Sequence, residues 1–207
     1  MKIITGTSRN IHSDLISCVA RYRYRVFVEK LGWRMNCKVD MEQDQFDRDD
    51  TVHVIALNDR DDIIGSARLL PTTRPYLLGT VFPQLLGASA PPASADVWEL
   101  SRFAAVDFGN PDQSALSQFS SAVAVSLLRQ SINCAASRGA QKLITVSPVG
   151  VERLLRRNGF TATRAGSPVI VDGNFTTAYW IDCIGNLQSV TPTHPEIAEL
   201  AIDAIDA

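Results

Sequence analysis

The sequence predicts an α/β fold, a three-layer sandwich in which helices cover a mixed β-sheet. Apolar runs typical of strands alternate along the chain with longer segments of helical period. The stretch 97–158 contains strand, helix, strand and helix in succession, which favours one central crossover connection. No linker divides the 207 residues. We therefore expect a single domain over 1–207, with a peripheral tail from about residue 193.

The first half of the chain is expected to hold one helix and a β-hairpin. Ser13 or Asp14 is a suitable N-cap for a helix that runs to about Lys30, and Gly32 ends it. Two apolar runs joined by a polar turn predict the hairpin. Its strands are expected at 52–57 and 63–70. Two segments without clear period are expected to be loops, at 34–50 and at 71–95, the second with one short helix near 81–86.

The second half is expected to hold the crossover and the last strands. A strand at 97–106 precedes a helix from about Ser114 to Ser137, which Gly139 ends. The further elements expected are a buried strand at 142–147, a helix at 149–158, strands at 169–171 and 178–184, and a short acidic helix after Thr193.

The composition is that of an ordinary globular protein, 45% hydrophobic and 20% charged, with a formal net charge of −2 and a pI near 5.9. Neither a nucleic-acid partner nor a membrane is indicated. The four cysteines and three histidines are scattered, so no metal site is expected. The N-terminus lacks the apolar core of a signal peptide, and no apolar run is long enough to span a membrane. These features predict a cytoplasmic protein with free thiols.

Two charged segments of the first half each allow a functional and a structural interpretation. Arg23 and Phe27 are four residues apart and share a helix face, which suits either a carboxylate and a flat base or a solvated basic face over core aromatics. The loop 40–50 is rich in carboxylates. It lacks the glycine and the glutamate that an EF-hand requires, which excludes calcium. Its acids would attract a cationic ligand or face solvent.

Two strand segments carry charges among apolar neighbours. Arg68 needs a partner, either one of the loop acids or the carboxylate of a substrate. In the strand at 97–106, Glu99 and Ser101 point to one face and Arg102 points to the other, unless a bulge intervenes. Burial would raise the pKa of Glu99 and suit it as a general base near neutral pH. The structural alternative is an ion pair of Glu99 with Arg102 or Arg68.

In this order and spacing, these segments resemble the acyl-homoserine-lactone synthases, the LuxI-type autoinducer synthases of bacterial quorum sensing. The resemblance is strong over roughly the first half and looser to about Phe160. The segments that carry it are Arg23-x-x-x-Phe27, Leu31-Gly32-Trp33, Asp44-Gln45-Phe46-Asp47, Arg68-Leu69-Leu70-Pro71-Thr72-Thr73, Val81-Phe82-Pro83 and Glu99-Leu100-Ser101-Arg102-Phe103.

The resemblance implies a fold like that of the GCN5-related N-acetyltransferases, and two substrates. These are S-adenosylmethionine and an acyl thioester on acyl carrier protein, which yield acyl-homoserine lactone, methylthioadenosine and holo-carrier protein. Glu99 would take the proton of the α-amino group, directly or through water. Lactonisation by the substrate carboxylate then requires placement more than acid or base help, because the sulfonium is a good leaving group. No metal or redox cofactor is required.

The family pattern also groups the site residues. The catalytic group is Glu99, Ser101 and Arg102, with a backbone N–H near 101–104 as a donor to the oxyanion. The arginines would hold the substrate carboxylate and the carboxylate network, the acids would complement the ammonium and sulfonium, and the aromatic rings would enclose the nucleoside. The residues of this S-adenosylmethionine site are Arg23, Phe27, Trp33, Asp44, Asp47, Arg68 and Phe82.

Two further surfaces are expected. The acyl chain needs an apolar tunnel, which by resemblance runs between the sheet and the later helices, although plain packing is the alternative for its lining. The candidates are Ser101, Phe103, Leu128, Thr145, Val146 and Val149. We expect a medium chain such as octanoyl from overall similarity. Acyl carrier protein is acidic, so its dock should be basic. The dock candidates are Lys142, Arg153, Arg156 and Arg157.

Two other functions fit the same fold class. An acetyl-coenzyme A N-acetyltransferase would cradle pyrophosphate on a glycine-rich turn at a helix N-terminus. The turn at 107–113 has a single glycine, which argues against this activity. A non-enzymatic sensor of an acyl or adenosyl ligand would have no need of Glu99.

Overall fold

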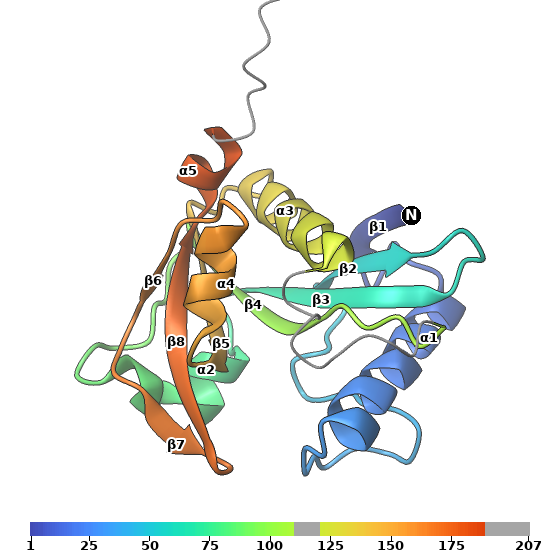
Figure 1. The fold of residues 1–207 in the computed structure, drawn as a ribbon, viewed down its shortest axis with the longest axis horizontal. Coiled ribbons are helices and arrows are strands. Elements are labelled where there is room, and N and C mark those ends of the chain that lie inside the picture. The colour runs from blue at the N-terminus through green and yellow to red at the C-terminus, as the bar shows by residue number, and fades with distance from the viewer. Residues whose placement is uncertain (110–120, 189–207) are drawn as a thin grey trace, which may run out of the picture.

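A computed structural model describes residues 1–109 and 121–188, which form one mixed sheet with helices on both of its faces (Figure 1). The strand order is β1-β2-β3-β4-β5-β8-β6, and β7 pairs with β8. Only β4 and β5 pair in parallel among these strands; the other pairs are antiparallel. The strands are β1 (Lys2–Thr7), β2 (Val52–Leu57), β3 (Ile63–Pro71), β4 (Val97–Ala104), β5 (Lys142–Pro148), β6 (Ala162–Arg164), β7 (Val169–Val171) and β8 (Asn174–Asp182).

The helical elements are a set of short and medium helices. They are α1 (Ser13–Arg23), the π-helix η1 (Tyr24–Lys30), α2 (Leu77–Val81), the 3₁₀-helix η2 (Pro83–Leu86), α3 (Ala122–Ala136), α4 (Val151–Arg157) and α5 (Cys183–Gln188). The crossover from β4 through α3 to β5 is the predicted one. Because β4 and β5 are parallel, their connection must bring the chain back to the end of the sheet at which β4 began.

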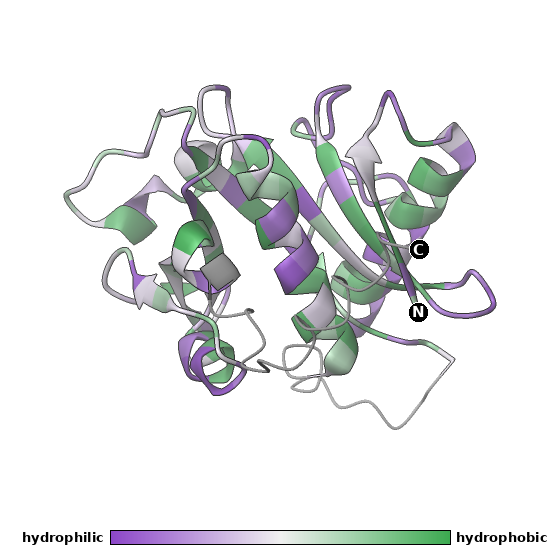
Figure 2. Cartoon of the chain, turned by 90° about the horizontal axis from the view of Figure 1, so that it is seen from above, coloured by the Kyte–Doolittle hydropathy of each residue, from purple (hydrophilic) through white to green (hydrophobic). Residues whose placement is uncertain are grey.

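Three layers follow from the alternation of apolar residues along the strands. On β2, Val54 and Ala56 pack in one cluster with Leu127 of α3, whereas Ile55 and Leu57 pack in another cluster with residues of α1. Since successive strand residues point to opposite faces, α1 and α3 cover opposite faces of the sheet. The predicted sandwich is therefore confirmed. Apolar residues concentrate on the central strands, and the outer turns are hydrophilic (Figure 2).

The first helix differs from its prediction in detail. Its N-cap is His12, one residue earlier than expected, and the ring Nδ1 of His12 accepts a hydrogen bond from the N–H of Asp14 at 3.3 Å. The expected end near Lys30 is confirmed, with Gly32 in a left-handed conformation. The last seven residues form a π-helix, in which the N–H of Leu31 donates to the carbonyl of Val26. Such π segments cannot be read from a period of 3.6 residues, and they are frequent at functional sites.

The boundaries of other elements differ from those predicted, and three elements were not predicted. The expected helix near 81–86 is two elements, α2 and η2, because Pro83 starts a separate 3₁₀ turn. The strands β1 and β6 and the helix α5 were missed, since each is short or lies at the end of a sheet path and so lacks a strong period. The ends of β4, α4 and β8 differ from prediction by two to four residues. The expected helix start at Ser114 and the tail helix lie outside the described residues.

The strands β4 and β5 part after a short parallel ladder, which we call the β4–β5 fork. The ladder pairs Val97–Leu100 with Lys142–Thr145. Beyond it, β4 pairs with β3 alone and β5 pairs with β8 alone. Figure 1 shows β3 lying roughly across the right half of the view, whereas β8 runs steeply through the left half. Beyond Leu100 and Thr145, therefore, the β4–β5 ladder does not continue.

Candidate functional site

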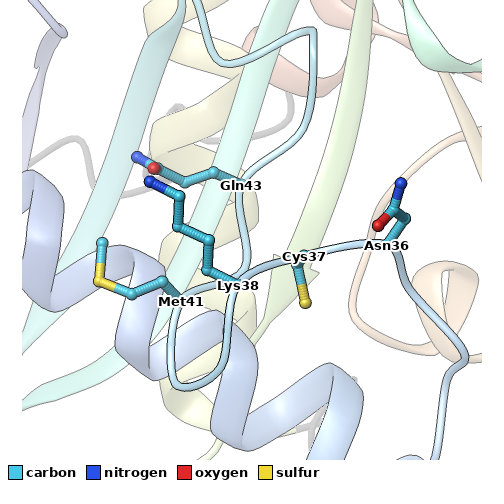
Figure 3. A pocket seen from close by; sticks show the side chains of 5 residues that line it. All are labelled: Asn36, Cys37, Lys38, Met41 and Gln43. Atoms are coloured by element: carbon cyan, nitrogen blue, oxygen red, sulfur yellow. The ribbon is translucent and has the colours of Figure 1, made fainter.

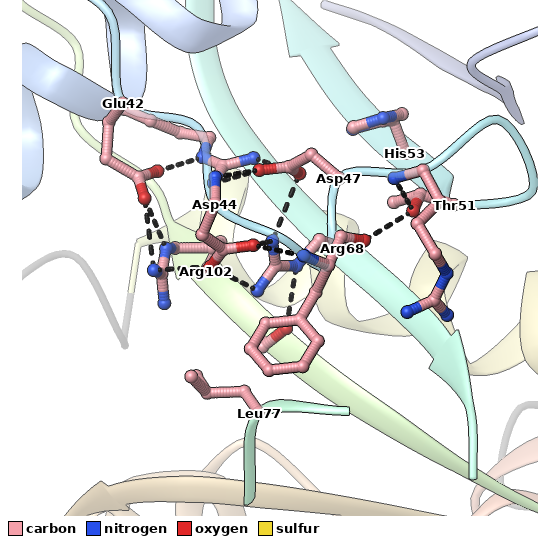
Figure 4. A network of polar contacts seen from close by, with 12 residues as sticks. Glu42, Asp44, Asp47, Thr51, His53, Arg68, Leu77 and Arg102 are labelled. Carbon is pink, nitrogen blue, oxygen red and sulfur yellow. Dashed lines mark hydrogen bonds and ion pairs between the residues drawn. The ribbon is translucent and has the colours of Figure 1, made fainter. Parts of the chain in front are cut away.

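The centre of the site is a cluster of ion pairs that we call the arginine–carboxylate network (Figure 4). Its three arginines come from α1, β3 and β4, and its three acids come from the loop between η1 and β2. The network therefore joins four separate segments of the chain. Its members are Arg23, Arg68, Arg102, Glu42, Asp44 and Asp47.

Two of the arginines make forked contacts with the loop acids. Arg23 donates from Nη1 and Nη2 to the carboxylate of Asp47 at 2.8 and 3.0 Å, and its Nε donates to Glu42. Arg68 donates from Nη1 and Nη2 to Asp44 at 2.6 and 3.1 Å, and its Nη1 also lies 3.0 Å from Asp47. Planar guanidinium groups match carboxylates in this bidentate geometry, so both side chains are held in one orientation.

Arg102 joins the network because β4 is bulged. The pairing of β3 with β4 shifts register between Ser66 and Arg68, and Arg102 has a φ of 52°. The bulge that was expected to be necessary is therefore present. It lets Arg102 donate from Nε to Glu42 at 3.0 Å and from Nη2 to Asp44 at 2.8 Å.

The network is buried and electrically balanced. Burial by itself would raise the pKa of Asp47, but the charges of Arg23 and Arg68 hold it well below its usual range. The interpretation of Arg23 as part of a solvated basic face is wrong, because this side chain is almost fully buried. Arg68 forms ion pairs with two acids of the loop, which is the structural interpretation of this residue. Three positive charges face three negative charges, so the network is neutral as a whole.

Glu99 lies beside the network without an arginine partner. Its carboxylate accepts hydrogen bonds from the backbone N–H groups of Leu77 at 3.1 Å and Leu78 at 2.6 Å, at the start of α2. Among the described residues, no ion pair joins Glu99 to Arg68 or Arg102, so the predicted structural alternative is wrong. The side chain is 1% exposed. Burial raises the pKa of Glu99, against the N–H of Leu78 and the charge of Arg68.

The aromatic residues expected at the site separate into two places. The rings of Phe27 and Trp33 stack with centroids 4.9 Å apart, and the guanidinium of Arg102 lies 5.8 Å from the Phe27 ring. Trp33 is 46% exposed, so a ring surface remains open to a ligand. Phe82 packs instead against the core cluster around α2 and η2. The structure thus unites Phe27 and Trp33 with the network and places Phe82 in another cluster.

The residues expected along the acyl chain flank the β4–β5 fork from both faces. Phe103 and Leu128 pack in the cluster on the α3 face, whereas Val146 packs in the cluster on the α2 face. Thr145 is the last residue of β5 that pairs with β4. Val149 lies past the end of β5 and is 41% exposed.

Three of the four expected dock residues share one helix. Arg153, Arg156 and Arg157 are exposed on α4, and Arg156 pairs with Glu152 at 2.7 Å. Lys142 begins β5, and its ammonium lies 6.0 Å from the centre of the Trp180 ring. The basic surface of α4 is therefore present, with Lys142 on a separate element.

The comparisons with known proteins agree with this geometry. A model of the autoinducer synthase family matches residues 7–188. The chain belongs to this family. It is 53% identical to an acyl-homoserine-lactone synthase of Acinetobacter nosocomialis over 182 residues, which cover 88% of this chain and 100% of that relative. The protein is thus an acyl-homoserine-lactone synthase, an acyltransferase enzyme, and the alternatives of a plain acetyltransferase and a non-enzymatic sensor are excluded.

Solved structures give the same answer for this synthase. TofI, in a ternary complex with an inhibitor and MTA, is 44% identical with a TM-score of 0.76, over 88% of this chain and 92% of that one. The coenzyme A-dependent acyl-homoserine lactone synthase BjaI, with SAM and isopentyl-CoA, is 26% identical with a TM-score of 0.76, over 90% and 86%. An acyl-CoA N-acyltransferase from Pseudomonas aeruginosa, 14% identical with a TM-score of 0.54 over 86% and 97%, shares the fold alone. The expected acyltransferase fold is confirmed.

Two buried residues of the synthase site were not singled out from the sequence. Glu42 is fully buried and bridges Arg23 and Arg102, but in the sequence it was one acid among many in its loop. His53 lies opposite Arg68 in the β2–β3 pairing, and its Nε2 is 3.1 Å from the hydroxyl of Ser8. Burial lowers the pKa of His53 to about 4, so the ring is neutral beside the network. No periodic signal in the sequence marks either residue.

The loop that carries the acids also shapes an open pocket of the synthase (Figure 3). It is lined by Asn36, Cys37, Lys38, Met41 and Gln43. Residues 1–109 and 121–188 contain no group of histidine, cysteine or acidic side chains placed to hold a metal ion. In the same part of the chain, no helix has the length and apolar character to cross a membrane.

Proposed function

We propose that the synthase transfers an acyl group from acyl carrier protein to the amino group of S-adenosylmethionine and then closes the lactone with release of methylthioadenosine. The observation that carries this proposal is the buried carboxylate of Glu99, which lies beside a neutral network and makes no ion pair among the described residues. The names of the related structures support it, because TofI was solved with MTA and BjaI with SAM.

The charges of the site and of the substrate are complementary. The arginine–carboxylate network balances internally, which leaves the ionised Glu99 as one extra negative charge. S-adenosylmethionine carries a carboxylate, an ammonium and a sulfonium, so its net charge is positive by one. Binding therefore neutralises the buried site, whereas an isolated buried charge would be costly. A substrate without the sulfonium would leave one negative charge uncompensated.

The exposure of the network indicates where the substrate meets it. Asp44 is the most exposed of the three acids, with 17% of its side chain accessible against 8% for Asp47 and 0% for Glu42. The open side of the network is therefore at Asp44 and Arg102. There the substrate sulfonium meets Asp44, and the nucleoside lies against the exposed ring of Trp33.

The chemistry then follows in two steps. Glu99 accepts a proton from the ammonium, and the free amine attacks the thioester carbonyl. The tetrahedral oxyanion needs hydrogen-bond donors, and we assign this role to the backbone of the bulged β4 segment. The intermediate then collapses: the carbon–sulfur bond of the thioester breaks, the nitrogen loses its extra proton, and the carrier sulfur leaves as the thiol by taking up a proton. The substrate carboxylate next attacks its own γ-carbon, and the bond from that carbon to sulfur breaks with both electrons going to the sulfur of methylthioadenosine. Arg102, at the open side of the network, orients that carboxylate.

The choice of acyl carrier protein as donor rests on charge. The exposed arginines of α4 are suited to an acidic protein surface. A preference for an octanoyl chain rests on overall similarity.

One incubation tests these assignments. The enzyme is mixed with S-adenosylmethionine and a set of acyl carrier proteins and acyl-coenzyme A thioesters of different chain lengths, and the products are identified by mass spectrometry. We expect octanoyl-homoserine lactone from the carrier protein as the main product. Lactone from coenzyme A thioesters alone would overturn the donor, a different main chain would overturn the octanoyl preference, and no lactone from any donor would overturn the function.

A further inference from the structure

A row of exposed apolar side chains crosses three strands near the end of β5. Ile170 of β7 and Phe175 of β8 are direct pairing partners, 62% and 63% exposed. The N–H of Val149 donates to the carbonyl of Phe175 at 2.9 Å, which continues the β5–β8 ladder by one residue. Residues that face each other across strands point to the same side. Val149, Phe175 and Ile170 therefore form one surface, which we call the hairpin patch.

Within residues 1–109 and 121–188, the outward side chains of the hairpin patch join no core cluster. The neighbouring residues Val169 and Val171 pack against the core cluster around α2, so the inner face of the hairpin is used. Ile170 and Phe175, on the outer face, belong to none of the core clusters. Single exposed apolar residues are ordinary, but a contiguous group of large ones marks an interaction surface.

The position of the hairpin patch relative to the fork fits the entry of a tethered substrate. On β5, Leu143 packs in the cluster on the α3 face, so Thr145 and Val149 point to this face as well. Glu99 points to the other face, toward α2. The hairpin patch and Glu99 thus lie on opposite faces of the sheet, and the β4–β5 ladder ends between them. Thr145, at the fork, is four residues from Val149, or about 13 Å along the strand.

The charges beside the hairpin patch indicate which kind of partner would bind there. The helix α4 starts two residues after Val149, and Arg153 and Arg157 are exposed on it. Among the described residues, no ion pair engages either arginine. A second copy of this chain, docked face to face, would bring these arginines against their own equivalents. An acidic partner with a small apolar centre fits the surface better.

We propose that the hairpin patch is the apolar centre of the surface on which acyl carrier protein docks, with the arginines of α4 at its rim. This inference rests on the proposed use of acyl carrier protein as donor. Docking here places the carrier's prosthetic arm at the fork, so that the arm delivers its thioester to the face of Glu99.

The test compares a protein-bound donor with a donor that lacks the protein. Phe175→Ser and Ile170→Ser are assayed with octanoyl carrier protein and with octanoyl-pantetheine, each substrate being varied in turn while the other is saturating. We expect each substitution to raise the KM for octanoyl carrier protein about tenfold, the effect of truncating a central apolar side chain of an interface. The KM values for octanoyl-pantetheine and S-adenosylmethionine should not change. Val39→Ser, at an 80% exposed valine of another loop, is the matched control.

Each contrary result has a distinct meaning. An unchanged KM for octanoyl carrier protein in both variants would overturn the docking surface while the proposed function stands. An equal rise in the KM for octanoyl-pantetheine would overturn it too, because the side chains would then contact the arm or the chain. Loss of a wild-type dimer in the variants, seen by sedimentation, would assign the patch to a second copy. If the wild type makes lactone only from coenzyme A thioesters, the proposed donor is wrong and this inference falls with it.

Discussion

The guanidinium of Arg102 lies 2.8 Å from the carboxylate of Asp44, a contact that joins β4 to the loop before β2. It depends on the bulge in β4 and on the left-handed backbone of Arg102, because an unbroken strand would direct this side chain to the face opposite Ser101. One local distortion of the strand therefore completes the network and sets its open side beside Trp33 and Phe27.

Arg102→Ala should destabilise the fold strongly. It leaves the fully buried Glu42 with one arginine instead of two, and breaking a buried ion pair in this way costs about 3–5 kcal/mol. Urea unfolding followed by circular dichroism measures the loss. Arg60→Ala, in the exposed turn between β2 and β3, is the control and should change stability by only about 0.5 kcal/mol. Equal losses in both variants would contradict the role of Arg102.

Glu99→Gln should lower kcat by a factor of about 10²–10⁴, because an amide keeps the shape of the side chain but cannot accept the proton. Burial raises the pKa of Glu99, and a base works in its deprotonated form. The wild-type rate should therefore fall as the pH drops through a value above the usual glutamate range. Kinetics from pH 4 to 9 with Glu29→Gln, an exposed glutamate, as control test both points. An acid limb that persists in Glu99→Gln would assign the base elsewhere.

Trp33→Ala should raise the KM for S-adenosylmethionine about tenfold, because the nucleoside would no longer have the open ring surface on which it stacks. Stability should fall by only about 1 kcal/mol, since the side chain is half exposed and loses mainly its stacking on Phe27. The KM for the acyl donor should stay constant, and Val39→Ala in the same loop should change neither constant. Equal effects on both substrates would place the nucleoside elsewhere.

The neutral ring of His53 should make stability depend on pH. Its pKa is lowered to about 4 in the folded state, so between pH 6.5 and 4 the unfolded chain binds the proton more readily. The free energy of unfolding should therefore fall by up to about 3 kcal/mol as the pH drops through this window. Unfolding in urea at pH 7, 5.5 and 4.5 should show this loss in the wild type and a smaller one in His53→Gln. The same slope in both proteins would refute the assignment.

Reversal of charge at Arg156 and Arg157 should raise the KM for acyl carrier protein and leave that for S-adenosylmethionine unchanged. Both side chains are exposed on α4, and an acidic partner is attracted through solvent, so the effect should weaken as salt is added. Arg60→Glu, on another surface, is the control. If both KM values stay put, the carrier protein docks at a different surface.

The sequence by itself determined the family and most of the elements. Long apolar runs such as 52–57 and 63–70 specify their strands locally, and the order of the charged segments carried the resemblance that the comparisons confirm. The strands β1 and β6, at the two ends of the sheet, were missed, because their stability comes from pairing with a distant strand and not from a local pattern.

Only the tertiary structure decided how the charges of the site combine. Whether Arg68 was paired with a loop acid or left for a substrate depended on which residues the fold brings within hydrogen-bond distance, and the same holds for the bridge that Glu42 makes. The two backbone donors of Glu99 come from the start of α2, more than twenty residues away along the chain. Ion pairing and burial are properties of contacts distant in sequence, whereas strand and helix period is a property of neighbours. Most elements could therefore be predicted from the sequence, whereas the balance of charge around Glu99 could not.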